Sequence, residues 1–434
     1  MNDRRQPLCG WGRYPVIEST VSSPRNPDAA QSLLRSDAVT IPRGNGRAYG
    51  DAALADTVLR TTQLDCLVDF DTETGVVDVE SGITLNQLVR AVLPYGWFLP
   101  VTPGTSFASV GGAIAADVHG KNHHVDGSFG RFVEQIDIID ASGDRVTLSR
   151  DHEPDWFRAT IGGMGLTGLI VSARLRLKSL QSTKIAETTI PCASAHELYD
   201  AILNNDARYS VAWVDMASKD IGRGNLSLGE HIEKPGNLSA RAMPRARRLP
   251  ALPFRLGLND TSIGAFNRLM VARANATTRT LPLGKFFYPL DAVDGWNAWY
   301  GDNGFIQYQF VLPLDGSRKG LDEVYRLVGS FRQRPYLAVL KLMGDSNESP
   351  LSFPMKGFTL AMDFPRQKNV ITDLGRLDLL IEELGGRVYL AKDAVSSQRL
   401  FQAGYPQWES FRELRASKGL DKVFQSSLSR RLEL

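Results

Sequence analysis

Three of the six histidines of this chain lie in one short stretch, DVHGKNHHVDGSFG, which runs from Asp117 to Gly130. Clustered imidazoles are consistent with a metal site, with a catalytic histidine on a cofactor loop, or with a turn rich in histidine. His123 and His124 are adjacent, so in a strand they would point to opposite faces, and no third ligand follows at zinc spacing. A metal site is therefore not expected, and His119 is left as either a catalytic group or an ordinary turn residue.

Two glycine-rich stretches offer chemistry that a lone histidine does not. The first, IPRGNGRAYGD, runs from Ile41 to Asp51, and the second runs from Val101 to Gly120 and ends at the histidine cluster. Closely spaced glycines allow tight turns that present backbone N–H groups to an anion, and Arg43 and Arg47 add positive charge. Neither stretch has the dinucleotide-binding pattern G-x-G-x-x-G or the phosphate loop G-x-x-x-x-G-K-[ST]. Taken separately, each stretch is more typical of a plain turn than of a binding loop.

The elements that must position these stretches change in kind along the chain, and 434 residues are enough for two domains. The first 180 residues mix short strands with helices, one of which begins with Thr84 and Gln87 at capping-box spacing. After about residue 178 the pattern predicts a second, mainly antiparallel sheet with two helices on one face. Its strands are expected at 210–216, 305–314, 337–344 and 358–365, and the helices at 321–333 and 370–386.

Composition narrows the class of protein. The chain is 43% hydrophobic and 23% charged with a net charge of +2, which is typical of a globular protein and does not indicate a nucleic-acid partner. The three cysteines Cys9, Cys66 and Cys192 are far apart and odd in number, which favours a reducing compartment. The N-terminal residues show no signal peptide, and no stretch reaches the roughly 18 apolar residues of a membrane span. A cytoplasmic location is expected.

Positive charge is concentrated between Arg241 and Lys285, where nine Lys/Arg stand against one acid, Asp260. This basic segment also carries leucine, phenylalanine and methionine. Two interpretations stay open: a solvated mobile loop, or a surface that meets anionic lipid headgroups on the inner face of the plasma membrane. Nucleic acid is disfavoured because aromatic residues are sparse among the basic ones.

Taken together, the glycine stretches carry a resemblance that neither carries alone. RGNGRAYGD, PGTSFASVGGAIAADVHGKNHH and IGGMGLTGLI, in this order and spacing, resemble the FAD-binding domain of the vanillyl-alcohol-oxidase/PCMH class of flavoenzymes. The later stretches LKLMG, LSFP, MDFP and VYLAKD resemble the branch of this class that acts on lipid-linked ribose. In that branch the flavin enzyme is one half of an epimerase that makes lipid-linked arabinose. The resemblance runs from CGWGRYP to SRRLEL, nearly the whole chain.

The resemblance implies an α+β fold with two domains. An FAD-binding domain made of two α/β subdomains is expected at residues 1–180. A substrate-binding domain, with an antiparallel sheet covered by helices, is expected at 181–387, and the segment 388–434 is expected to return to the FAD domain. Many members of the class attach FAD to a histidine in the first glycine loop, but GRAYGD contains none. FAD is therefore expected to bind without a covalent link.

Positions that match the family's contacts lie in both domains. The matches for FAD are Pro42, Arg43, Gly44, Asn45, Gly46, Arg47, Ala48, Tyr49, Gly50, Asp51, Ala52, Gly104, Ser109, Val110, Gly111, Gly112, Ala116, Asp117, Val118, His119, Ile170 and Tyr389. The matches for substrate are Tyr49, Lys121, Trp213, Gln307, Gln309, Lys341, Thr359 and Lys392. Lys121 and Lys341 are expected near the phosphate of a lipid-linked sugar, and Trp213 against the sugar or the lipid.

Two side chains match functional positions that suit proton transfer, His119 in HGKN and Lys392 in YLAKD. A base that takes the proton of a sugar hydroxyl needs reach and a pKa near the working pH. Lys392 is also expected beside the flavin N1/C2 edge, where a positive charge would stabilise the reduced, anionic flavin. Burial would lower the pKa of Lys392 enough for it to act as the base. The resemblance does not decide which of the two residues is the base.

The chain departs from the family pattern at two positions of its FTLAMDFP stretch. Ala361 stands where mycobacterial members carry a cysteine, and Thr359 stands where an asparagine is usual. Inhibitors that capture that thiol are expected to fail here, although turnover need not suffer. The change at Thr359 leaves open which pentose and which polyprenyl chain are bound.

The expected reaction is oxidation of the 2-hydroxyl of polyprenylphosphoryl-β-D-ribose to the 2-keto sugar, with hydride transfer to FAD. A separate NAD(P)H-dependent keto-reductase is implied as partner, because no segment of this chain is predicted to bind a nicotinamide. One alternative is an FAD oxidase of a soluble sugar, alcohol or aldonolactone, against which the basic segment 241–285 argues. Another is a flavin- or lipid-binding module without catalysis, against which the presence of both His119 and Lys392 argues.

Overall fold

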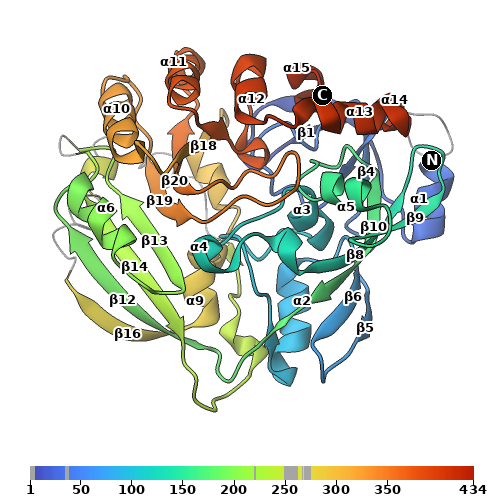
Figure 1. Ribbon diagram of the computed structural model, residues 1–434, viewed down its shortest axis with the longest axis horizontal. Helices are drawn as coiled ribbons and strands as arrows, with labels where there is room; N and C mark the ends of the chain where they lie inside the picture. The colour runs from blue at the N-terminus through green and yellow to red at the C-terminus, as the bar shows by residue number, and fades with distance from the viewer. Residues whose placement is uncertain (1–4, 35–38, 219–220, 249–261, 266, 268–274) are drawn as a thin grey trace.

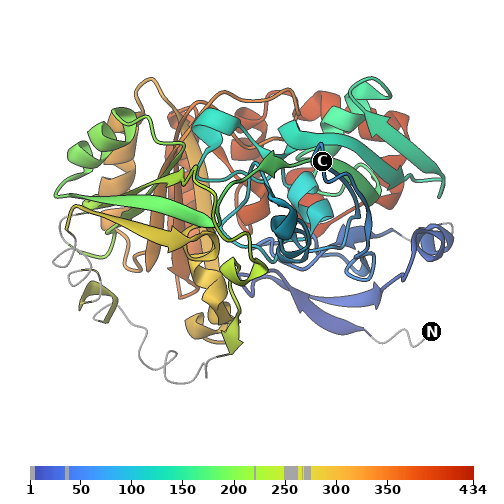
Figure 2. The same cartoon turned by 90° about the horizontal axis from the view of Figure 1, so that it is seen from below.

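The computed structural model describes the chain except for residues 1–4, 35–38, 219–220, 249–261, 266 and 268–274. Residues 249–261, 266 and 268–274 of the basic segment 241–285 therefore lie outside the described residues, and with them nearly half of the sequence on which the lipid-contact prediction rests. Two parts stand side by side in Figures 1 and 2. One contains the N-terminal elements, in blue and teal, and the other contains the elements from green to orange.

The first part is built on two sheets. A four-stranded sheet has the order β1-β2-β4-β3, in which β2, β4 and β3 run parallel. A five-stranded antiparallel sheet has the order β5-β6-β10-β8-β9. The strands are β1 (Gln6–Cys9), β2 (Val16–Ser22), β3 (Ile41–Arg43), β4 (Thr57–Arg60), β5 (Leu67–Phe70), β6 (Val76–Glu80), β8 (Val133–Ile139), β9 (Arg145–Ser149) and β10 (Leu169–Arg176). A short pair joins β7 (Trp97–Phe98) to β11 (Lys178–Ser179).

The helices of this part are α1 (Pro27–Leu34), α2 (Leu85–Val92), α3 (Val110–Ala115), α4 (His123–Asp126) and α5 (Pro154–Thr160). The predicted capping box is confirmed at α2, where the Thr84 hydroxyl accepts the Gln87 N–H at 3.2 Å and the Gln87 side chain accepts the Thr84 N–H at 2.9 Å. Leu85, Leu88 and Val89 of α2 are fully buried, and they lie in the same hydrophobic core as the buried residues of α3.

The strand geometry assumed for the adjacent histidines is wrong, because they lie in the one-turn helix α4. The Asn122 side chain closes this turn by donating to the Pro100 carbonyl at 2.9 Å and to Asp126 at 2.6 Å. His123 Nδ1 accepts the Gly344 N–H at 3.0 Å, whereas His124 Nε2 meets the Ala207 carbonyl at 3.0 Å. The two rings thus tie α4 to different neighbours. Over the described ranges, no group of three or more His, Cys, Asp or Glu has the arrangement of a metal site.

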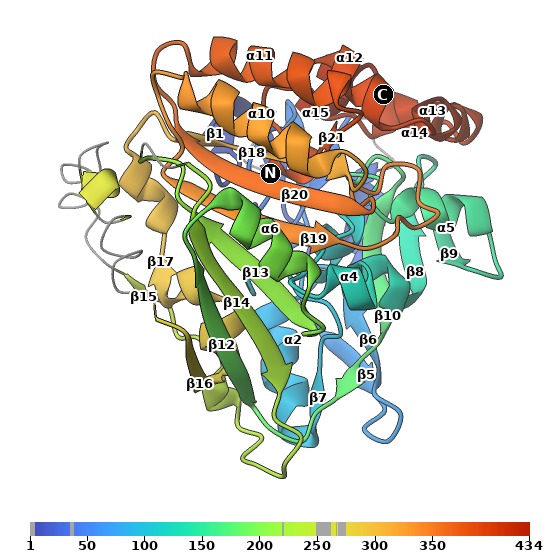
Figure 3. The same cartoon turned by 60° about the vertical axis from the view of Figure 1, so that its left-hand side comes forward.

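The second part is one antiparallel sheet of eight strands in the order β16-β12-β14-β13-β19-β20-β18-β21. Helices α6, α10 and α11 cover one face of it (Figure 3). The apolar sides of these helices pack in one core with the strands. Helices α10 and α11 correspond to the two helices that the sequence predicted on one face of this sheet. The elements are β12 (Lys184–Cys192), β13 (Tyr209–Val214), β14 (Gly224–His231), β16 (Thr277–Pro282), β18 (Phe305–Pro313), β19 (Leu337–Met343), β20 (Gly357–Pro365), β21 (Arg387–Val388), α6 (Ala195–Leu203), α10 (Ser317–Gly329) and α11 (Val370–Glu383). Smaller elements are β15 (Arg247–Arg248), α9 (Leu283–Phe287) and β17 (Val293–Asp294).

After β21 the chain leaves the sheet through the short helical turn Leu390–Lys392 and returns to the first part. The returning helices are α12 (Gln398–Gly404), α13 (Trp408–Ser417), α14 (Leu420–Val423) and α15 (Ser427–Leu432). Leu428 and Leu432 of α15 are fully buried in a core with Ile41 and Leu54. These red helices lie beside the first part in Figure 1. The α+β two-domain fold predicted from the sequence is confirmed.

Candidate active site

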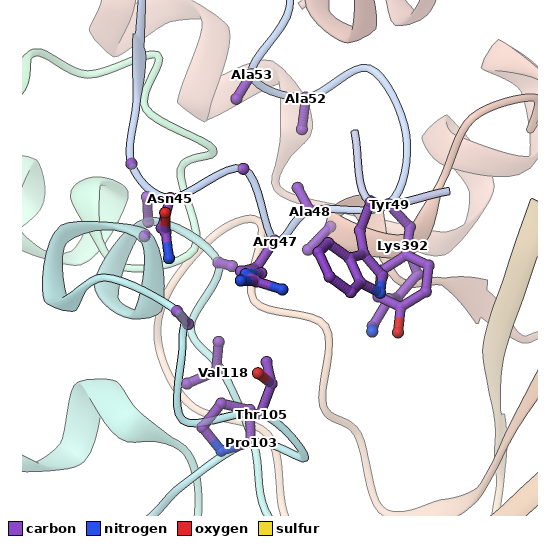
Figure 4. A pocket seen from close by; sticks show the side chains of 18 of the residues that line it. Asn45, Arg47, Ala48, Tyr49, Ala52, Ala53, Pro103, Thr105, Val118 and Lys392 are labelled. Carbon is purple, nitrogen blue, oxygen red and sulfur yellow. The ribbon is translucent and has the colours of Figure 1, made fainter. Parts of the chain in front are cut away.

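A cavity of about 330 Å³ lies where the two glycine stretches meet the open face of the eight-stranded sheet. The two stretches face each other across it in Figure 4. The lining is Trp11, Pro42, Arg43, Gly44, Asn45, Gly46, Arg47, Ala48, Tyr49, Ala52, Ala53, Thr61, Ser81, Pro103, Gly104, Thr105, Ala108, Ser109, Gly111, Gly112, Ala115, Ala116, Val118, His119, Met164, Gly165, Gly168, Ile170, Leu290, Asp291, Trp296, Gln307, Gln309, Leu337, Val339, Lys341, Ala361, Tyr389, Ala391 and Lys392.

The first glycine loop follows β3 and has room for an anion along its backbone. Within the described part of the chain, no hydrogen bond is found from the backbone N–H groups of residues 44–48. Gly44 lies so close to the second loop that a Cβ there would stand 2.0 Å from Ser109 Oγ. The Arg43 guanidinium donates to the carbonyls of Cys9 at 2.7 Å and Ala53 at 3.2 Å, so it stabilises the conformation of the loop.

Arg47 is the cation of this loop that faces the cavity (Figure 4). Its guanidinium carbon lies 4.0 Å from the centre of the Trp11 ring, a distance typical of a cation–π contact. Its Nε is buried and has no partner among the described residues. Burial lowers the pKa of Arg47, but an arginine stays charged. Arg47 thus offers a positive charge and an unused N–H donor beside the free backbone N–H groups of residues 44–48. This combination is suited to binding a phosphate.

The second glycine loop is held in place by one acid of the other domain. Asp291 accepts the Ser106 N–H at 2.6 Å, the Ser106 hydroxyl at 2.7 Å and the Thr105 hydroxyl at 2.8 Å. Ser109 then caps α3 by accepting the Gly112 N–H at 3.3 Å. The first N–H groups of α3 are also occupied, because Val110 donates to the Ile83 carbonyl at 2.9 Å and Gly111 to the Ser81 carbonyl at 2.8 Å.

Two half-buried lysines face the sheet end of the cavity. Lys392 comes from the turn after β21, and its Nζ lies 3.5 Å from the centre of the Tyr49 ring (Figure 4). Desolvation lowers the pKa of Lys392 to about 7, with Asp363 opposing and Lys341 adding to the effect. Desolvation also lowers the pKa of Lys341, on β19, to about 8. Both amines can thus exist in charged and neutral forms near neutral pH.

Asp363 forms the layer behind these lysines. It is 1% exposed on β20 and accepts a short hydrogen bond from the Gln307 side chain, which lines the cavity. Burial raises the pKa of Asp363 to about 6. Since Gln307 stands between this acid and the cavity, Asp363 acts on Lys392 through charge rather than through a direct ion pair.

His119 is 6% exposed, and its ring is in contact with Tyr389, Phe353 and Gln309. Its ring centre lies 5.0 Å from that of Tyr389 and 5.4 Å from that of Phe353. Gln309 Nε2 lies 3.0 Å from His119 Nε2 and 3.1 Å from the Thr359 hydroxyl, so this amide donates to both. Burial, with the nearby lysines, holds the pKa of His119 well below its usual range. The ring is therefore neutral, with Nε2 as acceptor and the proton on Nδ1.

Comparisons with known proteins agree with this geometry. The family model described as an FAD binding domain matches residues 21–149. The chain is 33% identical to decaprenylphosphoryl-β-D-ribose oxidase of Mycolicibacterium smegmatis over 98% of this chain and 97% of that protein. The chain belongs to this oxidase family. It is also 33% identical to an uncharacterised Streptomyces coelicolor protein over 81% of this chain and all of that one. At 23% identity it resembles L-gulono-1,4-lactone dehydrogenase of Mycobacterium tuberculosis over 93% and 92% of the two chains.

As a member of this family the chain is an FAD-dependent oxidoreductase, and the residues present fit that cofactor. The free N–H groups of 44–48 and the unused Nε of Arg47 belong to the first loop, and the start of α3 lines the same cavity with Ser109, Gly111 and Gly112. Gly44 and Gly111 have no space for a Cβ, which would stand 2.0 Å from Ser109 Oγ and 2.9 Å from Ser81 Cβ. The approach at Gly44 brings the two loops into contact, and the approach at Gly111 packs the second loop against the segment that follows β6. The contacts of individual residues with FAD stay predictions.

Most of the predicted site residues line the cavity, but some do not. The predicted FAD contacts that do not line it are Gly50, Asp51, Val110 and Asp117. Asp117 is buried, accepts the Gly130 N–H at 2.8 Å and holds the Ser352 side chain, so it joins loops rather than facing the cavity.

Among the predicted substrate contacts, Lys121, Trp213 and Thr359 also lie outside the lining. Lys121 Nζ donates to the backbone carbonyl of Phe286 and lies 4.0 Å from the centre of the Phe286 ring. Thr359 is fully buried and reaches the cavity only through Gln309. A direct contact of these three residues with substrate stays a prediction, and for Lys121 and Thr359 the structure shows a supporting contact instead.

Several lining residues were not expected from the sequence. They are mainly aromatic and apolar residues, with one acid: Trp11, Pro103, Leu290, Asp291, Trp296, Leu337 and Val339. Trp11 and Trp296 form an edge-to-face pair with ring centres 5.8 Å apart, although 285 positions separate them in the chain. Alternation along strand 337–344 was a usable signal for Leu337 and Val339, because they share a face with Lys341.

Proposed function

We propose that this chain oxidises the 2-hydroxyl of polyprenylphosphoryl-β-D-ribose to the 2-keto sugar. The observation that carries the proposal is that one cavity joins the FAD cradle to Lys392, Lys341 and His119. The relative from Mycolicibacterium smegmatis, which is similar over its whole length, is named for oxidation of decaprenylphosphoryl-β-D-ribose. FAD supplies the hydride acceptor.

Lys392 is the better of the two candidates for the base. With a pKa lowered to about 7, a large share of its amines is neutral at working pH and can take the proton of the sugar hydroxyl. The acceptor nitrogen of His119 is already occupied by the Gln309 amide. His119 Nδ1 carries the proton and has no partner within the described structure, so it can donate to a sugar oxygen and orient the ring. Lys392 would take the proton of the hydroxyl oxygen while the carbon that bears this oxygen gives up a hydride, for which bound FAD would be the acceptor, and the alcohol becomes a ketone.

Lys341 supplies positive charge for the phosphate of the substrate. It lines the cavity on the same side of the sheet as Leu337 and Val339. Leu290, at the edge of the cavity, is 40% exposed, which gives a polyprenyl chain an apolar surface at the exit. No described helix is long and apolar enough to span a bilayer. We infer that the chain meets its lipid substrate from the membrane surface, with the basic segment 241–285 against anionic headgroups.

A separate keto-reductase is part of the proposal. Gly163 to Gly168 reads GMGLTG and has the spacing G-x-G-x-x-G, but it connects helix α5 to strand β10. A dinucleotide fingerprint needs the opposite order, with a strand before the glycines and a helix after them. We therefore assign reduction of the 2-keto sugar by a nicotinamide to another protein.

The test is a visible absorption spectrum of the purified protein before and after anaerobic addition of polyprenylphosphoryl-ribose. Bleaching of the flavin band, with release of the flavin by acid precipitation, is the expected result. A flavin that stays oxidised with this lipid sugar but bleaches with an aldonolactone would replace the proposed substrate by a soluble one. Sedimentation with anionic vesicles at low salt tests the membrane contact separately, and an unbound protein would refute it.

A further inference from the structure

Arg431, near the end of the chain on α15, makes buried contacts with two acids that flank the active site. Its Nε and Nη2 bind the Asp51 carboxylate at 3.1 and 2.9 Å, and Nη2 also binds Asp393 at 2.9 Å. Its Nη1 donates to the Ser396 carbonyl at 2.6 Å. The acids are 5% and 1% exposed at their side chains. In this setting the cost of desolvation offsets much of the attraction between the charges, but the loss of one partner leaves an uncompensated buried charge.

The two acids belong to different parts of the active site. Asp51 ends the first glycine loop, three residues after the last free N–H group of the FAD cradle. Asp393 follows Lys392 directly, and its carboxylate also accepts the Ser396 N–H at 2.8 Å and the Ser396 hydroxyl at 2.5 Å. Although burial opposes it, Arg431 and Ser396 hold the pKa of Asp393 below its usual range. The Asp393 carboxylate is thus held by its own turn as well as by the guanidinium, whereas the Asp51 carboxylate is bound by Arg431.

The backbone joins the same two segments directly. Tyr49 N–H donates to the Ala391 carbonyl at 2.9 Å, and the Tyr49 ring carries Lys392 Nζ on its face. A Cβ on Gly50 would stand 1.6 Å from the Asp393 carbonyl oxygen, so only glycine permits this approach. The two segments also share a buried core, in which Ala52 packs with Leu390 and Ala391. The bidentate arginine behind them supplies a further fastening.

Helix α15 is itself tied to the cofactor loop. The Ser427 N–H at its start donates to the Leu54 carbonyl at 2.7 Å, and Leu428 is fully buried beside Leu54. The neighbouring Arg430 differs: it reaches the exposed Asp56 at 3.3 Å, with side-chain exposures of 49% and 63%. The two adjacent arginines therefore form a matched pair: Arg431 is half-buried and binds two buried acids, and Arg430 is exposed and binds an exposed acid.

We propose that Arg431 is a positioning residue that fastens the FAD-binding loop to the Lys392 segment, so that cofactor binding and the placement of Lys392 depend on each other. The inference rests on the proposed use of Lys392, but its consequence for the cofactor needs no substrate. When the fastening opens, the loop loses its fixed N–H groups and water reaches the lysine.

The test compares Arg431→Gln, Arg431→Lys and Arg430→Gln with the unchanged protein. Two quantities are measured without any sugar: the dissociation constant of FAD, by flavin fluorescence, and the pH titration of the bound flavin's absorption band. Arg431→Gln is expected to raise the FAD dissociation constant by roughly tenfold or more, equivalent to about 1.4 kcal/mol. Its titration midpoint is expected to rise from about 7 toward the ordinary lysine value of 10.5. Arg430→Gln should stay within about twofold, since exposed ion pairs contribute little.

Arg431→Lys keeps the positive charge but loses the planar guanidinium that binds a carboxylate through two N–H groups. This variant is expected to fold, and its FAD dissociation constant and titration midpoint should shift in part. If Arg431→Gln does not fold, this second variant decides. The proposal is overturned if the folded variants bind FAD and titrate as the unchanged protein does, with only their melting temperature lowered. Failure of the unchanged protein to oxidise the lipid sugar would refute the proposed function and leave these two measurements valid.

Discussion

Replacing Lys392 by methionine is expected to lower turnover and raise stability at the same time. Methionine has nearly the length of the lysine stem but neither charge nor basic nitrogen. Loss of a positioned base costs about 10²–10⁴ in rate. That range corresponds to roughly 3–5 kcal/mol of transition-state free energy. In the unchanged protein kcat should rise with pH up to about 7 and then level off, because the lysine accepts a proton only when neutral. The variant should lose this rise.

The gain in stability follows from the lowered pKa of Lys392. The unfolded chain, with a lysine pKa of 10.5, binds this proton more tightly than the folded protein, where the pKa is about 7. The resulting penalty is complete below pH 7 and disappears as the pH rises toward 10.5. Linkage sets it at no more than roughly 5 kcal/mol at pH 6 and 2 kcal/mol at pH 9. For a chain of this length, about 1 kcal/mol corresponds to ~1 °C in Tm.

The assay is thermal unfolding at pH 6 and pH 9 with saturating FAD, beside steady-state turnover with the lipid sugar. Lys368→Met is the control, because Lys368 is exposed and outside the site. It should change neither rate nor Tm. The reasoning is refuted if Lys392→Met turns over within about tenfold of the unchanged protein. It is also refuted if the variant is less stable than the unchanged protein at pH 6.

Three further predictions concern other parts of the cavity. An inhibitor that captures a thiol at the position of Ala361 should leave no mass adduct on this chain, whereas Ala361→Cys should acquire one, because this position lines the cavity. Gln309→Leu removes the donor that fixes His119, so kcat should fall by about tenfold while the FAD dissociation constant stays the same. Gly44→Ala should weaken FAD binding by roughly tenfold or more because its Cβ would stand 2.0 Å from a serine hydroxyl of the other loop. Gly375→Ala, whose Cβ would meet nothing within 4 Å, should bind FAD normally.

Local pattern was enough to predict the elements that carry the cavity. Alternation and helical periodicity predicted the strands around Gln307 and Lys341 and the helices behind them, since each depends on neighbours within one element. The glycine loops were found because their chemistry is local as well: turns that expose N–H groups need glycines close together in sequence. His123 and His124 were misplaced because the one-turn helix α4 depends on Asn122 and its bond to a distant carbonyl.

The parts of the site that were missed are those made by residues far apart in sequence. Asp291 holds a loop 185 positions away, and Arg431 reaches Asp51 across 380 positions. No spacing rule connects such residues, and each of them alone reads as an ordinary surface charge. The same limit applies to Asp363, whose influence on Lys392 depends on how two strands are paired.

The charges of the cavity explain why a lysine with a lowered pKa suits this site. Arg43 is occupied by backbone carbonyls, and Arg47 lies on an aromatic ring toward Asp291, so both belong to the cofactor end. At the sheet end Lys341 and Lys392 have no lining acid beside them. Desolvation lowers the pKa of both amines, and the charge of Lys341 lowers that of Lys392 further, so Lys392 is readily neutral. Under the proposed function, the phosphate of the lipid sugar would favour the charged form of Lys341 and leave Lys392 as the base. Binding of the anion and readiness for proton transfer thus come from the same pair of lysines.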